Sequence, residues 1–238
     1  MLGQSGIHVV VQIIALNRLG YSAFLISTRL ACPAITQLLS LADCSIILTT
    51  PTFHPVLGEV QQNRQLEILP LLQPDDVFRH DAPRFVRDYL PEAESRKVAV
   101  IIHSSGSTGL PKPIYLTNGS CIGAFAVHMN MRGFLTSPFF HSHGFYEVFR
   151  SIYSGKQIYF TNYNLPLTRE TVMAQLRAVR PEIFHCVPYV IKLLAESEEG
   201  IQMLADMKMV LYAGSGCPDD LGDRLVEQGV NLCGNYGA

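Results

Sequence analysis

The residues best suited to chemistry lie in one stretch, Ser-Ser-Gly-Ser-Thr-Gly-Leu-Pro-Lys at positions 104–112. Its glycines let the backbone approach a ligand closely, and its hydroxyls and amide N–H groups can donate to anionic oxygens. Lys112 adds a mobile positive charge. The stretch is not a Walker loop, because Pro113 follows the lysine where Ser or Thr is required. We predict a phosphate-binding loop, and the alternative is a polar surface turn. The candidate residues are Ser104, Ser105, Gly106, Ser107, Thr108, Gly109 and Lys112.

A second group of polar residues is the histidine pair in Ser-Pro-Phe-Phe-His-Ser-His-Gly-Phe, at positions 137–145. A neutral imidazole can donate one hydrogen bond to an anionic substrate, and a protonated one attracts the anion. Two histidines at i and i+2 on a strand would also share one face, as a metal site requires. No carboxylate or cysteine lies at a spacing that would complete a metal site, so the sequence argues against one here.

A third group lies near the C-terminus, where Ala213, Gly214, Ser215 and Gly216 follow an apolar run at 209–212. A glycine-rich loop between a strand and a helix is common in α/β folds, so the loop alone is weak evidence. Cys217 has no histidine and acid partner in a matching context, which disfavours a catalytic thiol.

The pattern of apolar segments predicts the elements that position these loops. The run at 97–102 has the length of a buried strand and leads directly into residues 104–112. A predicted helix at 5–18, strand at 21–27, helix at 33–42 and strand at 45–50 alternate before it. Helices at 118–132, 144–153, 168–179 and 188–196 and strands at 157–160, 182–187 and 209–212 continue the alternation. The predicted fold class is α/β, with parallel-sheet layers joined by crossover helices. In such sheets ligands bind at the carboxyl ends of the strands.

Composition narrows the functional classes. The chain has 238 residues, of which 48% are hydrophobic and 16% charged, so it can bury a substantial core. Its net charge of −2 and lack of a basic cluster argue against a nucleic-acid or acidic-membrane partner. The apolar segment at 7–16, interrupted by His8 and Gln12, is shorter than the ~20 residues of a membrane span. The six cysteines include no Cys-x-x-Cys pair, so we expect reduced thiols and a cytoplasmic protein.

Residues 104–112 resemble the phosphate-binding motif of the adenylate-forming superfamily, which includes acyl-CoA synthetases, adenylation domains of nonribosomal peptide synthetases and beetle luciferases. His103 and Ser104 stand where the family has an aromatic residue and Thr, and Pro113 replaces the last glycine. The Pro-Lys-Pro-Ile form resembles fungal synthetase-like enzymes. Residues 137–145, 213–218 and 234–238 are similar to further family motifs, in the family's order.

The resemblance implies a reaction and a set of roles. A carboxylic acid would react with ATP and Mg²⁺ to give an acyl-adenylate, which a thiol of CoA or of a carrier phosphopantetheine would accept. Ser107, Thr108 and Lys112 would hold the β- and γ-phosphates, and His141 would lie by the carboxylate. The acid pocket would include His141, His143, Val187, Pro188 and Gly216, and the nucleotide site Ala213, Gly214, Ser215, Asn235, Tyr236 and Gly237, with Tyr236 stacked on adenine.

One missing residue bears on the substrate. Adenylation domains for α-amino acids resemble one another in placing an Asp in this segment, to pair with the substrate ammonium. Here the single acid within 133–150 is Glu147. An unpaired ammonium in a buried pocket is costly, so we expect an aryl, keto or fatty acid.

The resemblance also implies that residues 1–238 form a partial AMP-binding domain, without its extreme N-terminus and without the small C-terminal domain. The Mg²⁺-binding acid would follow Ala238. We therefore expect this polypeptide alone to form acyl-adenylate weakly or not at all. Two alternatives stay open: an inactive fragment or pseudoenzyme that only binds nucleotide or protein, and an unrelated α/β nucleotide-binding protein.

Overall fold

The computed structural model describes residues 1–73, 75–76, 83, 85–104 and 109–237. These residues form two compact units, Met1–Gly123 and Ala124–Ala238. The first unit has two sheets and the second has one, and each unit has its own hydrophobic core.

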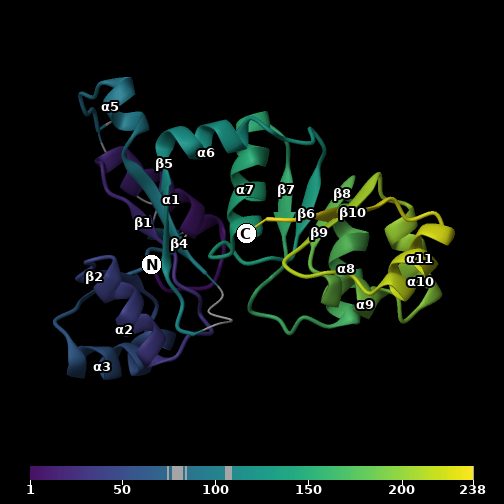
Figure 1. The fold of residues 1–238 in the computed structure, drawn as a ribbon, viewed down its shortest axis with the longest axis horizontal. Helices are drawn as coiled ribbons and strands as arrows, with labels where there is room; N and C mark the ends of the chain where they lie inside the picture. The colour runs from purple at the N-terminus through teal and green to yellow at the C-terminus, as the bar shows by residue number, and fades with distance from the viewer. Residues whose placement is uncertain (74, 77–82, 84, 105–108, 238) are drawn as a thin grey trace. The chain divides into compact units, whose positions relative to one another are not determined.

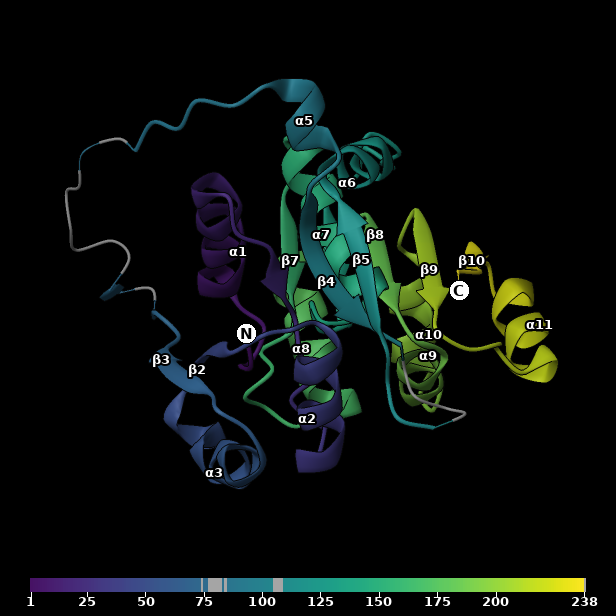
Figure 2. The ribbon, with the colours of Figure 1, turned by 60° about the vertical axis from the view of Figure 1, so that its left-hand side comes forward.

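The first unit contains two small sheets (Figure 2). In one, β1 (Ala23–Phe24) pairs in parallel with β4 (Val98–His103), and β5 (Pro113–Thr117) pairs antiparallel on the other side of β4. In the other, β2 (Ile46–Thr49) pairs in parallel with β3 (Glu67–Pro70). The predicted strands are therefore present, but the first two belong to different sheets, which their alternation with helices could not reveal.

The helices of the first unit match the prediction in part. Helix α1 (Ile7–Leu19) is terminated by Gly20, whose φ of 92° is the left-handed conformation that favours glycine. The helix predicted at 118–132 ends at residue 125. Asn130, inside the predicted range, has a φ of 56°, which is incompatible with a right-handed helix. The elements are α1 (Ile7–Leu19), α2 (Cys32–Leu41), η1 (Pro51–Phe53), α3 (His54–Asn63), α5 (Pro91–Ser95) and α6 (Asn118–Phe125), which reaches into the second unit.

The second unit is built on a five-stranded sheet in the order β10-β9-β8-β6-β7 (Figure 1). Every pairing in it is parallel. Its strands are β6 (Gly133–Leu135), β7 (Ile158–Phe160), β8 (Ile183–Cys186), β9 (Met209–Ala213) and β10 (Leu232–Asn235). Its helices are α7 (Ser142–Ser154), α8 (Arg169–Val179), α9 (Pro188–Leu194), α10 (Glu198–Ala205) and α11 (Asp219–Glu227). The parallel α/β fold predicted from the sequence is confirmed here.

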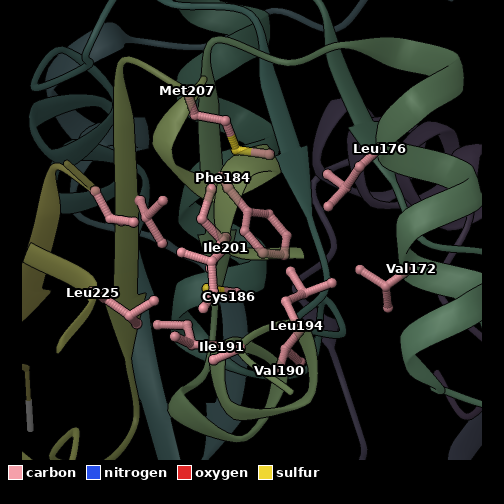
Figure 3. Close-up of a cluster of buried hydrophobic side chains, with 14 of the residues drawn as sticks. Val172, Leu176, Phe184, Cys186, Val190, Ile191, Leu194, Ile201, Met207 and Leu225 are labelled. Atoms are coloured by element: carbon pink, nitrogen blue, oxygen red, sulfur yellow. The ribbon is translucent and has the colours of Figure 1, made fainter. Parts of the chain in front are cut away.

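The main core of this unit lies between one face of the sheet and helices α8 to α11. Phe184 and Cys186 of β8 are fully buried there, among Val172 and Leu176 of α8 and Leu225 of α11 (Figure 3). Successive side chains of a strand point to opposite faces, so His185, between these two, faces the other side. Helix α7 covers that side, since its Glu147 carboxylate lies 3.5 Å from the His185 ring.

Among the helices of the described residues, none combines the length and the apolar character that a membrane span requires.

The core assignment predicts a large effect for a single truncation. Phe184→Ala should lower the free energy of unfolding by about 3–5 kcal/mol, because it leaves a cavity beneath α8 and α9. Val226→Ala, at a position 56% exposed on α11, should change it by no more than about 0.5 kcal/mol. Urea unfolding followed by circular dichroism measures both, and equal effects would show that Phe184 is not a core residue.

Candidate functional site

The predicted site residues of the second unit gather at one edge of its sheet. Because all five strands are parallel, their carboxyl ends meet at the same edge. His141 lies in the connection after β6, Val187 and Pro188 follow β8, and Gly214 begins the loop after β9. Ala213 is the last residue of β9, Ser215 and Gly216 continue its loop, Asn235 is the last residue of β10, and Tyr236 and Gly237 follow it.

The connections that leave two neighbouring strands diverge at this edge. The connection of β6 leads to β7 on one side, whereas the connection of β8 leads to β9 on the other, although β6 and β8 are neighbours. Ligands of open α/β sheets bind where neighbouring connections diverge in this way. The segment before His141 and the pair Val187 and Pro188 flank this point.

The turn that carries His141 is held from two directions. Tyr163 donates a hydrogen bond of 2.7 Å to the Ser137 carbonyl. Gly144 approaches so closely that a Cβ on it would lie 2.1 Å from the Pro138 carbonyl oxygen. His141, the N-cap residue of α7, is exposed at the end of this turn. A rigid turn can thus present the imidazole to solvent or to a ligand.

The residues predicted to contact nucleotide are mostly accessible. Gly214, Ser215 and Gly216 are exposed, and Gly214 has a φ of 93°, a conformation that a residue with a Cβ rarely adopts. The Tyr236 side chain is 94% exposed, so its ring face is available for stacking. Pro188, predicted for the acid pocket, is buried as the first residue of α9, so it also has a structural role.

The predicted phosphate-binding loop belongs to the first unit, and Ser105, Gly106, Ser107 and Thr108 lie outside the described residues. Its two ends are joined: the Ser104 N–H donates to the Lys112 carbonyl, and the Lys112 N–H donates to Ser104 Oγ, both at 3.0 Å. Gly109 has a φ of 152°. Lys112 itself is exposed.

His103 fixes the start of this loop, a role that sequence reasoning missed. Its Nε2 accepts a hydrogen bond of 3.0 Å from the Ser27 N–H, so its Nδ1 carries the proton and donates to the Ser104 carbonyl at 2.9 Å. Burial lowers the pKa of His103, which keeps the ring neutral at pH 7. The sequence indicated an unusual role for this residue, because His103 stands where the family has an aromatic residue.

A buried polar group lies between α7 and β8, and we call His143, Glu147 and His185 the α7–β8 cluster. His143 is on α7 and not on a strand, so the argument from strand spacing was wrong. A carboxylate that could share a metal ion with His143 is present, although the sequence did not reveal it. Glu147 lies one helical turn after His143, and His185 of β8 lies close to both. Arg150 forms an ion pair with Glu147. The signal in the sequence was a His and a Glu at i and i+4; His185 is too distant in the chain to be linked by spacing.

Burial governs the charge of these groups. Burial, with the nearby Arg150 charge, lowers the pKa of His143 to about 4. Burial, together with electrostatic repulsion from His143 and Arg150, lowers the pKa of His185 to about 3. Both rings are therefore neutral at pH 7. Burial raises the pKa of Glu147, and the Arg150 guanidinium opposes the shift.

Cys217 lies in the loop after β9, and desolvation together with Asp219 and Asp220 raises its pKa. Its thiol stays protonated at neutral pH, which disfavours a nucleophilic role.

The chain belongs to the AMP-binding enzyme family, whose model matches residues 1–238. Among its relatives is a carboxylic acid reductase of Neurospora crassa, 25% identical over 98% of this chain and 24% of the relative. Adenylate-forming reductase Nps9 of Serpula lacrymans is 28% identical over 90% of this chain and 22% of the relative. The chain thus spans about a quarter of the length of these relatives.

Solved structures share the fold. The N-terminal domain of FACL13 from Mycobacterium tuberculosis aligns with a TM-score of 0.83 at 19% identity, over 100% of this chain and 61% of that one. O-succinylbenzoate CoA synthetase of Bacillus subtilis, in complex with AMP, aligns with a TM-score of 0.77 at 21% identity, over 100% and 60%. At these identities the likeness establishes the fold.

The close approach at residue 144 gives a test of the turn. Gly144→Ala should lower the free energy of unfolding by about 1–3 kcal/mol or prevent folding of the second unit, because its Cβ would overlap the Pro138 carbonyl. Gly222→Ala on α11 is the matched control, since a Cβ there meets nothing nearer than 3.9 Å. The control should be neutral or stabilising by up to about 1 kcal/mol. If both variants unfold at the same denaturant concentration, the turn does not have the described geometry.

Proposed function

We propose that this chain binds ATP and a carboxylic acid and contributes to activation of the acid as an acyl-adenylate. A carboxylate oxygen attacks the α-phosphorus, a C–O–P linkage forms, and the bond from that phosphorus to the β-phosphate oxygen breaks, releasing pyrophosphate. The observation that carries the proposal is the shared carboxyl edge of the second unit, where three of the predicted motifs lie around a divergence of strand connections.

The roles follow from what each side chain offers. His141 would donate a hydrogen bond to the substrate carboxylate, Tyr236 would stack on adenine, and the backbone at Gly214 would lie along the base. Lys112 would attract the β- and γ-phosphates. The catalytic contribution of these groups is positioning and stabilisation of negative charge. Mg²⁺, which is present with ATP in a structure of the Bacillus subtilis synthetase, would neutralise phosphate charge.

The larger context is also part of the proposal. We propose that residues 1–238 form part of an AMP-binding domain within a cytoplasmic enzyme. The acceptor of the acyl group would be the thiol of CoA or of a carrier phosphopantetheine. Supporting relatives are reductases and CoA ligases, including an anthranilate CoA ligase solved with anthranoyl-AMP.

The substrate we propose is an aryl, keto or fatty acid. The single acid within 133–150, Glu147, is buried and already paired with Arg150. It is therefore not available to pair with the ammonium of an α-amino acid.

The proposed contact of Lys112 with the β- and γ-phosphates can be tested by comparing the binding of ATP and of AMP. Lys112→Ala should weaken ATP binding roughly 10- to 100-fold, since a hydrogen bond to a charged group contributes about 1.5–3 kcal/mol. AMP binding should be unchanged, because AMP lacks the phosphates that Lys112 would contact. Titration calorimetry measures both, with Lys156→Ala, an exposed lysine of the second unit, as control. Equal losses for ATP and AMP would refute this role, and absence of nucleotide binding by the folded wild type would refute the proposed function.

The substrate class can be tested with two ligands that differ by one ammonium group. The sulfamoyl-adenosine derivative of 3-phenylpropanoic acid should bind at least about 10-fold more tightly than that of phenylalanine, because the unpaired ammonium must lose its hydration. Competition between the two for the same protein measures the ratio directly. Tighter binding of the phenylalanine derivative would mean that an α-amino acid is the substrate.

A further inference from the structure

The α7–β8 cluster has the composition of a transition-metal site. Each of its three residues offers one ligand atom, and these atoms all lie within 4.8 Å of one another. His185 is 3% exposed and Glu147 5% exposed, so the cluster is not a solvated surface group. Two imidazoles and one carboxylate are a ligand set that zinc uses in proteins, with a further position left for water.

Two ring nitrogens of the cluster lack a hydrogen bond within the part of the chain that the structure describes. His143 Nε2 and His185 Nδ1 are buried and have no hydrogen-bond partner among the described residues. Most buried polar atoms are paired, so two unpaired nitrogens beside one carboxylate require an explanation. Glu147 Oε2 lies 3.5 Å from His185 Nδ1, which matches the roughly 3.4 Å between ligand atoms in a tetrahedral zinc site. Because all three ligand atoms lie within 4.8 Å of one another, no pair would need to close by more than about 1.4 Å.

The surrounding groups leave the correct atoms available. Ser137 Oγ lies 3.4 Å from His143 Nδ1 and can accept a hydrogen bond from an N–H there, which leaves the lone pair on Nε2 for a metal ion. Arg150 binds Glu147 through Oε1 and leaves Oε2 for a metal ion. Hydrogen bonds of this kind orient metal ligands in known sites. The positive charge of Arg150 opposes a cation, and its ion pair with Glu147 offsets part of that cost.

We infer that His143, Glu147 and His185 bind a zinc ion between α7 and β8, with water as a fourth ligand. The ion would join the helix that follows the His141 turn to the central region of the sheet. Because the ion would bind the folded state selectively, it would stabilise the second unit.

Zinc uptake by the purified chain tests the inference. After removal of metals, the wild type should take up one equivalent of Zn²⁺ in competition with a chromophoric chelator. His143→Gln, Glu147→Gln and His185→Gln should each lower the affinity at least about 100-fold, and Ser137→Ala, which removes an orienting hydrogen bond, about 10-fold. His128→Gln is the control: its Nδ1 is also buried and unpaired, but it lies outside the cluster, so its affinity should match the wild type.

Two spectra keep the test valid if a ligand variant fails to fold. Co²⁺ in the wild type should give the intense visible absorption of a tetrahedral centre, and X-ray absorption of the zinc form should show two imidazole ligands. Thiolate charge-transfer bands would instead assign the metal to cysteines and overturn the inference. No stoichiometric uptake by the wild type, or equal affinity in the ligand variants, would overturn it too. ATP binding measured on the zinc-free protein separates this outcome from failure of the proposed function.

Discussion

Five strands of the second unit run parallel, and this single constraint determines where its polar loops lie. Parallel pairing sends every carboxyl end to one edge, so segments separated by about a hundred residues in the chain come together there. The buried residues of β8 and the helices above them maintain that register, since a slip by one residue would exchange Phe184 and Cys186 with His185. Core packing and site geometry therefore depend on the same pairing.

Much of this arrangement could be predicted from the sequence because it depends on local patterns. Apolar runs predicted β4, β8 and β9, and the helix predicted at 168–179 is present as α8, with Thr168 as its N-cap. Membership in the AMP-binding enzyme family, predicted from four short motifs, is confirmed over the whole chain. The roles assigned to individual residues stay predictions.

Other features depended on contacts that spacing does not encode. The separation of β1 and β2 into different sheets follows from pairing with β4 and β3, which lie far along the chain. Strand β6 was missed because its residues, Gly-Phe-Leu, have a weaker strand propensity than the Ile-Tyr-Phe of the equally short β7. The α7–β8 cluster unites a helix and a strand about forty residues apart, so its third member could not be recognised. His103 likewise acquires its role from Ser27, on a distant segment.

We propose that an acyl-adenylate binds at the carboxyl edge of the second unit, where the loops after β6, β8, β9 and β10 lie. Hydrogen–deuterium exchange of the chain with and without a non-hydrolysable acyl-adenylate mimic tests it most directly. We expect slower exchange in peptides covering 136–144, 213–218 and 232–237, with helices α8 and α11 unchanged. Protection confined to other segments, or no protection at a saturating concentration of the mimic, would contradict it.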